Sequence, residues 1–197
     1  YDRYFDSFEH YYSLYQRRNL DLWAEYADGK VTKEELNRQR YLYPLEAVGA
    51  GDSTLAKAYE RDALTMIPTK SKLMPHAREV LEYLSGKYNL YILSNGFKEL
   101  QSHKMRSSGI DEYFKKVVLS DDIGILKPWP EIFHFALSTT QSELNNSLMI
   151  GDSWENDIVG AAGVGMHQVF YNLSGRTDLP FAPTYQITDL KDLFNFL

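Results

Sequence analysis

The 197-residue sequence contains no cysteine. Disulfide bonds, thiolate zinc sites, cysteine nucleophiles and iron–sulfur clusters are therefore excluded, and we expect a cytoplasmic protein. No apolar run approaches the roughly 18 residues that a membrane-spanning helix needs, so we expect no membrane partner. Positive charge is not in excess either: 21 Lys and Arg against 27 Asp and Glu give a formal net charge of -6. That balance disfavours a nucleic acid polymer as partner, whereas a small phosphorylated substrate needs only one local lysine or metal ion.

The composition is that of an ordinary globular protein, with 44% hydrophobic and 24% charged residues. The length suits one domain with an insertion, or two small domains. The first 70 residues have the pattern of helices only. A capping box that begins at Thr32 predicts a helix to about Ala47, and another helix is predicted from Asp52 or Ser53 towards Ile67. The helix before them is predicted from aromatic residues at spacings of three and four: Tyr1, Phe5, Phe8, Tyr12 and Tyr15.

Short apolar strands alternate with amphipathic helices from residue 75 onwards. Strands are predicted at residues 90–93, 117–119, 148–150 and 169–171. Helices are predicted around them at residues 75–84, 98–107, 131–137, 156–162 and 190–196. This alternation predicts an α/β fold, a Rossmann-like parallel sheet wrapped by helices. The chain is therefore expected to comprise an all-helical domain, residues 1–70, and an α/β domain, residues 71–197.

Polar residues follow three of the predicted strands, at the edge where open parallel sheets bind ligands. Ser94, Asn95 and Gly96 follow the first strand and offer a hydroxyl and backbone N–H groups to an anion. Taken alone, an ordinary helix cap is the simpler explanation of these residues. Lys127, in an apolar stretch before Pro128, is a solvated surface group or a cation that neutralises a phosphoryl oxygen.

The third strand end carries two carboxylates. Gly151 permits a sharp turn after the strand, Asp152 follows it directly, and Asp157 lies in the first turn of the next helix. Two carboxylates that converge on one point suit Mg²⁺, which takes oxygen ligands and keeps several waters. The alternative is that Asp152 is a loop residue and that Asp157 only complements the helix dipole.

Together these three features resemble motifs two, three and four of the haloacid dehalogenase (HAD) superfamily. The helical segment resembles the cap that this superfamily inserts between its first and second motifs. Within that segment, residues 23–26, Gly29 and residues 32–40 are similar to the pyrimidine 5′-nucleotidase-like phosphatases. The residues that carry the resemblance in the α/β segment are Ser94-Asn95-Gly96, Lys127-Pro128, Gly151-Asp152 and Asp157.

The resemblance implies a Mg²⁺-dependent phosphohydrolase that works through an aspartyl-phosphate, a form of covalent catalysis. Its substrate would be a small phosphomonoester such as a nucleoside 5′-monophosphate or a sugar phosphate, and we expect a monomer. Lys127 would be catalytic, because it would stabilise the phosphoryl charge and the nucleophile. Phosphate binding is assigned to Ser94, Asn95, Gly96 and Lys127, and Mg²⁺ binding to Asp152 and Asp157.

The first motif of the superfamily, Asp-x-Asp, occurs nowhere in the 197 residues. The acidic pair in Ser120-Asp121-Asp122 lies between motifs two and three, where no catalytic task is expected. The resemblance places the strand of the first motif in the middle of the sheet, and its loss would leave flanking backbone groups unsatisfied, at about 1–3 kcal/mol each if buried. We therefore expect an N-terminal segment of a few tens of residues beyond this sequence, and no activity without it.

Other functions remain open at this point. A metal-free 2-haloacid dehalogenase would use the same covalent aspartate, but it has no comparable role for Asp152 and Asp157. A phosphoglucomutase-like activity and a catalytically inert HAD-like fragment or binding module are further alternatives. In the helical segment Arg38, Arg40 and Tyr43 are candidates to face a substrate, whereas the aromatic stripe of the first helix is expected to be core.

Overall fold

The computed structural model describes residues 3–197. The chain divides into two compact units, Tyr1–Thr69 and Lys70–Leu197, and each unit is described by itself. Nowhere along the described chain is a helix both long enough and apolar enough to cross a membrane. Mixed helices and parallel strands confirm the predicted α/β class.

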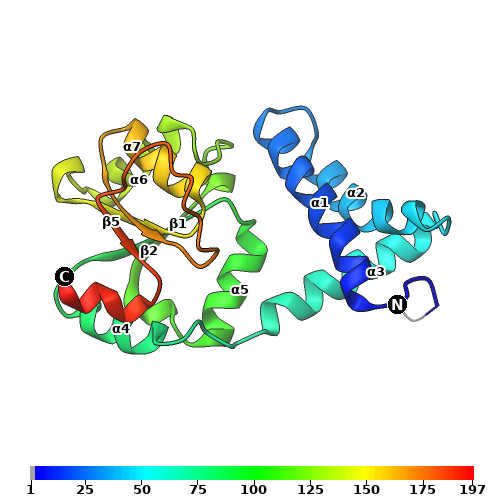
Figure 1. The fold of residues 1–197 in the computed structure, drawn as a ribbon, viewed down its shortest axis with the longest axis horizontal. Helices are drawn as coiled ribbons and strands as arrows, with labels where there is room; N and C mark the ends of the chain where they lie inside the picture. Colours follow the sequence, from blue (N-terminus) through cyan, green and yellow to red (C-terminus); the bar gives the residue numbers. More distant parts are fainter. Residues whose placement is uncertain (1–2) are drawn as a thin grey trace. The chain divides into compact units, whose positions relative to one another are not determined.

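The first unit is built from helices, as predicted (Figure 1). Its helices are α1 (Phe8–Ala27), α2 (Lys33–Ala47) and α3 (Ser53–Met66), followed by a short 3₁₀ turn (Ile67–Thr69). Each α-helix begins at a side chain that accepts a hydrogen bond from a free backbone N–H: Ser7, Thr32 and Asp52. The cap at Ser7 starts α1 later than predicted, and Tyr1 lies outside the described residues.

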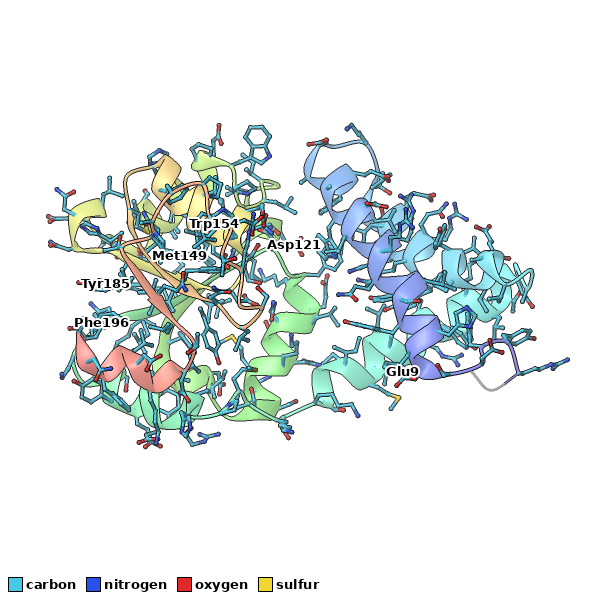
Figure 2. The ribbon with its side chains drawn as sticks, viewed as in Figure 1. Glu9, Asp121, Met149, Trp154, Tyr185 and Phe196 are labelled. Carbon is cyan, nitrogen blue, oxygen red and sulfur yellow. The ribbon has the colours of Figure 1, made fainter. Side chains whose placement is uncertain are left out.

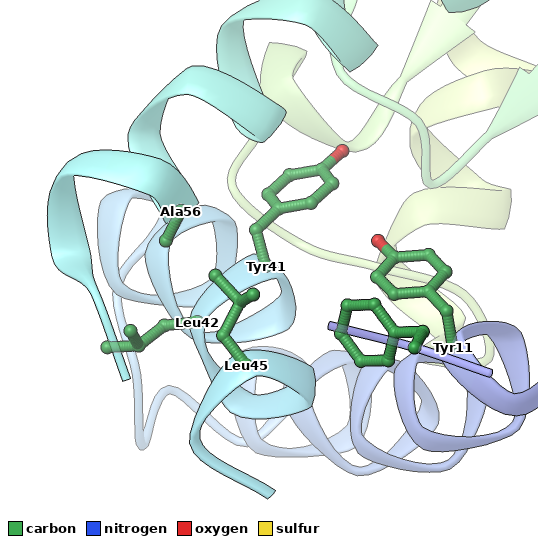
Figure 3. Close-up of a cluster of buried hydrophobic side chains, with 6 residues drawn as sticks. Tyr11, Tyr41, Leu42, Leu45 and Ala56 are labelled. Carbon is green, nitrogen blue, oxygen red and sulfur yellow. The ribbon is translucent and has the colours of Figure 1, made fainter. Parts of the chain in front are cut away.

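Aromatic residues of α1 form the core of this unit, as expected. Tyr11 is buried, and its ring stacks 5.8 Å from that of Tyr15, which lies 5.9 Å from the ring of Tyr41. Phe8 and Tyr12 are exposed, so only part of the predicted stripe is buried. Figure 3 shows the buried cluster, which comprises Phe5, Tyr11, Tyr41, Leu42, Leu45 and Ala56.

The second unit alternates strands with helices, and all of its strand pairs are parallel. Its strands are β1 (Leu90–Ser94), β2 (Phe114–Leu119), β3 (Leu148–Gly151), β4 (His167–Tyr171) and β5 (Tyr185–Ile187). Its α-helices are α4 (Ala77–Ser85), α5 (Lys98–Ser108), α6 (Pro130–Thr140) and α7 (Gly160–Gly163). Strand β5 was missed, because two of its three residues are exposed and it has no apolar run.

Within the described residues the parallel strands form two sheets, not one continuous sheet. One sheet contains β1 and β2, and the other has the order β3-β4-β5. Every residue of β1 and β3 is only half-buried, whereas β4 has three consecutive buried residues. The inner strands of a parallel sheet covered by helices are normally its most buried ones. In residues 3–197, β1 and β3 therefore each have one edge without a strand partner.

Two hydrophobic clusters keep the two sheets adjacent. On one face, α4 and the C-terminal residues cover Leu90 of β1 together with Leu148 of β3. On the other face, α6 and α7 cover Leu93 of β1 together with Met149 of β3. Figure 1 shows these helices on opposite sides of the strands. Each core is thus shared by both sheets, which holds their open edges near one another.

Two predicted helices of this unit have a different geometry. The segment after β3 begins as a π-helical turn (Trp154–Val159) before it becomes α7, and Ile158 N donates to Ser153 O, five residues back. The last segment is a 3₁₀ helix (Leu190–Asn195) that begins at Asp189. Beyond it, Phe196 stacks on Tyr185 of β5 with 4.1 Å between ring centroids (Figure 2).

Amide hydrogen exchange should distinguish the inner strand from the open edges. β4 has a hydrogen-bonded neighbour on both sides, whereas β1 and β3 each have one. Because exchange follows local opening, we expect the amides of β4 to exchange about tenfold more slowly than those of β1 and β3. Hydrogen–deuterium exchange followed by NMR or mass spectrometry measures this. Equal protection of all three strands would contradict the split sheet.

Candidate functional site

The structure brings Lys127 and Asp157 together at the carboxyl ends of β1 and β3. Lys127 Nζ lies 2.6 Å from Asp157 Oδ1, and both residues are buried, at 9% and 4% exposure. The same ammonium group donates to the carbonyl oxygen of Leu93, the penultimate residue of β1, at 2.8 Å. Lys127 is thus a buried cation that connects the end of β1 with the segment after β3, not a solvated surface lysine.

Asn95 fixes the backbone of Lys127. Its Oδ1 accepts from Lys127 N at 2.7 Å, and its Nδ2 donates to Lys127 O at 3.0 Å. The hydroxyl of Ser120, which is buried at the end of β2, donates to Asn95 O at 3.3 Å. The sequence predicted that Asn95 would offer its backbone to a phosphate. That backbone role stays a prediction. The Asn95 side chain in addition holds the loop that carries Lys127, and an asparagine directly after a strand was the only signal of this second role.

Ser94 is held so that its hydroxyl proton is available. Its Oγ accepts from Gly96 N at 3.0 Å and from Gln101 Nε2 at 2.8 Å. With two acceptor interactions made, the O–H group is left to donate to an anion. A Cβ at Gly96 would meet the amide end of the Gln101 side chain, so a larger residue there would displace the hydrogen bond from Gln101 to Ser94. Gln101 was not predicted as a site residue, because a glutamine in an amphipathic helix carries no recognisable signal.

Asp157 is fixed from two sides. Besides the ion pair with Lys127, its Oδ2 accepts from Ser153 N at 3.0 Å. A Cβ at Gly151 would overlap the Asp157 carboxylate, which explains the glycine at the end of β3. The function of Gly151 is therefore to leave room for the carboxylate as well as to permit the turn.

Asp152 is placed differently from Asp157. Its side chain is exposed, and among residues 3–197 it makes no hydrogen bond or ion pair. No group of three or more His, Asp or Glu side chains in that range is arranged to hold a metal ion. The chemistry of the two carboxylates still fits Mg²⁺, which takes one or two carboxylates and completes its shell with water and substrate oxygens. Magnesium binding by Asp152 and Asp157 therefore stays a prediction.

The predicted substrate-facing residues of the first unit differ in environment. Arg38 is exposed and pairs with Glu35 at 2.6 Å, so it has the contacts of a surface residue. Tyr43 is half-buried and Arg40 is buried. Whether any of them faces a substrate stays a prediction.

Serine, lysine and aspartate side chains at the carboxyl ends of parallel strands define an α/β protein that is suited to bind a small anion there. The family model for haloacid dehalogenase-like hydrolases matches residues 1–165. The chain therefore belongs to the haloacid dehalogenase-like hydrolases, as the resemblance of its motifs indicated.

Two relatives and two solved structures illustrate the similarity. YfnB of Bacillus subtilis, named as a HAD-hydrolase, is 29% identical over 187 residues, 93% of this chain and 78% of that protein. The crystal structure of YfnB bound to magnesium matches with a TM-score of 0.86 at 28% identity, covering 95% of this chain and 82% of the other. The pyrimidine 5′-nucleotidase YjjG of Escherichia coli is 30% identical over 185 residues, 93% and 80% of the two chains. A crystal structure of a dehalogenase matches with a TM-score of 0.79 at 25% identity, covering 96% and 84%.

Replacing Gly151 tests how tightly the site is packed. In Gly151→Ala the new methyl group meets the Asp157 carboxylate, so that carboxylate or the end of β3 must move. We expect the free energy of unfolding to fall by about 1–3 kcal/mol in urea titrations. The control is Gly163→Ala at the end of α7, where nothing lies within 4 Å of the added Cβ. That control should be neutral or slightly stabilising, and equal losses in both variants would contradict the packing described.

Proposed function

We propose that this chain forms the greater part of a Mg²⁺-dependent phosphohydrolase that acts on small phosphomonoesters. The observation that carries the proposal is the buried Lys127 ammonium group, which contacts Leu93 O near the end of β1 and the Asp157 carboxylate after β3. The Asn95 side chain holds the backbone of Lys127 through two hydrogen bonds, and Ser94 offers a free hydroxyl proton at the end of β1. A fixed cation and a hydroxyl donor of this kind stabilise a phosphoryl group whose charge is spread over its oxygens.

We infer that a further parallel strand, outside these 197 residues, fills the space between β1 and β3. Three observations support it: the two strands face no partner along one edge, both are only half-buried, and the hydrophobic clusters on the two faces continue across both sheets. An Asp-x-Asp sequence at the carboxyl end of that strand would lie at the same edge as Lys127. It would supply the nucleophile and the general acid/base, and residues 71–197 would be the rest of its domain.

The residues of this chain have defined tasks in that reaction. The nucleophilic carboxylate forms a bond to phosphorus as the ester P–O bond breaks, and the leaving oxygen takes a proton from the second aspartate. Lys127 neutralises the phosphoryl charge and Ser94 donates to a phosphoryl oxygen, with Asn95 and Gly96 shaping the loop between them. Asp152 and Asp157 would hold Mg²⁺, which supplies further charge neutralisation when bound. Water then cleaves the aspartyl-phosphate and releases inorganic phosphate.

The substrate proposed is a nucleoside 5′-monophosphate or a sugar phosphate. The similarity to YjjG, named as a pyrimidine 5′-nucleotidase, supports the first. Residues 1–70 would act as the cap that selects the leaving group. We also propose that the protein is a monomer. The absence of cysteine fits a location in the cytoplasm, which we propose as well.

A 2-haloacid dehalogenase is the second candidate, because a structure named as a dehalogenase matches this fold. The two carboxylates distinguish the candidates. Metal-free displacement of a halide gives Asp152 no task, whereas Mg²⁺ binding uses both Asp152 and Asp157.

Strand complementation tests the proposed activity. The chain is mixed with a synthetic peptide that has an apolar segment followed by Asp-x-Asp. The peptide has about eight residues, the length of a typical strand and the turn after it. Phosphate release from a panel of nucleoside monophosphates and sugar phosphates is then measured with MgCl₂. We expect release with this peptide, none with an Asn-x-Asp peptide, and a loss of about 10- to 100-fold in the Asp152→Asn variant, because a metal ligand is removed.

Each contrary result identifies the part of the proposal that is wrong. A peptide that fails to protect β1 and β3 from hydrogen exchange would contradict the inserted strand. A peptide that protects both strands without phosphate release would contradict the phosphohydrolase. Halide release from 2-chloropropionate in EDTA would establish the dehalogenase instead.

A further inference from the structure

Three polar side chains share one buried face of α2 in the first unit. Asn37, Arg40 and Tyr41 are spaced three and four residues apart, which places them on one side of the helix. Their exposures are only 9%, 7% and 3%. A buried arginine next to a buried asparagine and tyrosine is unusual for a helix that otherwise packs aliphatic residues.

Within residues 3–197, each of the three has one buried polar atom that lacks a hydrogen-bond partner. Arg40 Nε, Asn37 Oδ1 and Tyr41 Oη are buried without a hydrogen-bond partner among the described residues. Other arginines of the same unit are paired: Arg18 with Glu25 at 2.7 Å and Arg38 with Glu35 at 2.6 Å. Over the described chain, Arg40 has no carboxylate at ion-pair distance.

The contacts that Arg40 does make are too weak to compensate its burial. Its guanidinium lies 5.0 Å from the centroid of the Tyr41 ring, a cation–π contact. Such a contact is small beside the desolvation of an unpaired charge. The charge of Glu60 in α3 helps to raise the pKa of Tyr41, and among the described residues no ion pair joins Glu60 to Arg40. Burial raises the pKa of Tyr41 to about 12, so its hydroxyl keeps its proton and can donate at neutral pH.

We propose that Arg40, Tyr41 and Asn37 form an oxyanion-binding site in the helical unit. The planar guanidinium would bind two oxygens of the anion, and the Tyr41 hydroxyl would donate to one of them. Asn37 Oδ1 is an acceptor, so it requires a ligand that still carries an O–H group beside its charge. Hydrogen phosphate has this pattern, and so does a carboxylate with a neighbouring hydroxyl group. Sulfate lacks the O–H. The proposal does not rest on the proposed phosphate hydrolysis, since it is argued from side chains of the first unit alone.

Arginine side-chain NMR tests the site without interference from anion binding elsewhere. The Nε–Hε signal of Arg40 is assigned with the variant Arg40→Lys and followed during titrations with sodium phosphate, sodium sulfate and sodium glycolate. We expect a saturable shift of the Arg40 signal with phosphate or glycolate, with at least about tenfold weaker binding of sulfate, because sulfate leaves Asn37 unpaired. Whichever of phosphate and glycolate binds more tightly identifies the source of the oxyanion.

The matched control is Arg38, which lies two residues away, exposed and paired with Glu35. Its signal should not shift, and Arg38→Lys should bind phosphate or glycolate with unchanged affinity at Arg40. Equal shifts of Arg38 and Arg40, or no saturation at Arg40, would overturn the proposal.

The variant Arg40→Met separates ligand binding from a structural role. Methionine keeps the packing of the side-chain stem but removes a buried charge that has no protein partner. In buffer free of phosphate and carboxylates, its melting temperature should equal or exceed that of the wild type. A lower melting temperature would show that Arg40 stabilises the fold itself, and would overturn the proposal.

Discussion

The buried ion pair between Lys127 and Asp157 is the interaction on which the arrangement of the candidate site depends. Lys127 belongs to the loop after β2, reaches the carbonyl oxygen of Leu93 at the end of β1, and contacts a carboxylate in the turn after β3. The pair therefore joins segments of both sheets on the side where ligands of parallel sheets bind. It also gives a chain of negative net charge one fixed cation, and Asn95 holds that cation through the backbone.

The open edges of β1 and β3 are the second feature that organises the α/β unit. Apolar side chains of both strands are covered by the same helices, so the cores persist even though the strands do not pair with each other. Along their open edges, β1 and β3 lack the hydrogen bonds and the burial that the inner strands of a sheet normally have. A strand between β1 and β3 would end beside Lys127. The proposed catalysis and the stability of the α/β unit would therefore both depend on the space between these two strands.

Sequence patterns predicted the parts that depend on local periodicity. The four longer strands, the capped helices of the first unit and the position of Ser94, Lys127 and Asp157 at strand ends all follow from such patterns. The partner of Lys127 could not be predicted, because it is set by tertiary packing between segments 30 residues apart. For the same reason, the sequence could not predict that Gln101 fixes the Ser94 hydroxyl, or that Arg40 is buried without an ion-pair partner among the described residues. The split of the sheet was foreseen only as a consequence of the missing Asp-x-Asp motif, through the resemblance to the HAD superfamily.

The most direct test of the central role of the ion pair is a double-mutant cycle on the free energy of unfolding. Lys127→Met and Asp157→Asn each leave one buried polar partner unmatched, so each should cost about 3–5 kcal/mol in urea titrations. If the two residues act as one pair, the double variant should cost about 0.5–3 kcal/mol less than the sum of the single losses. Losses that simply add would contradict the account, because they would show that Lys127 and Asp157 stabilise the unit independently.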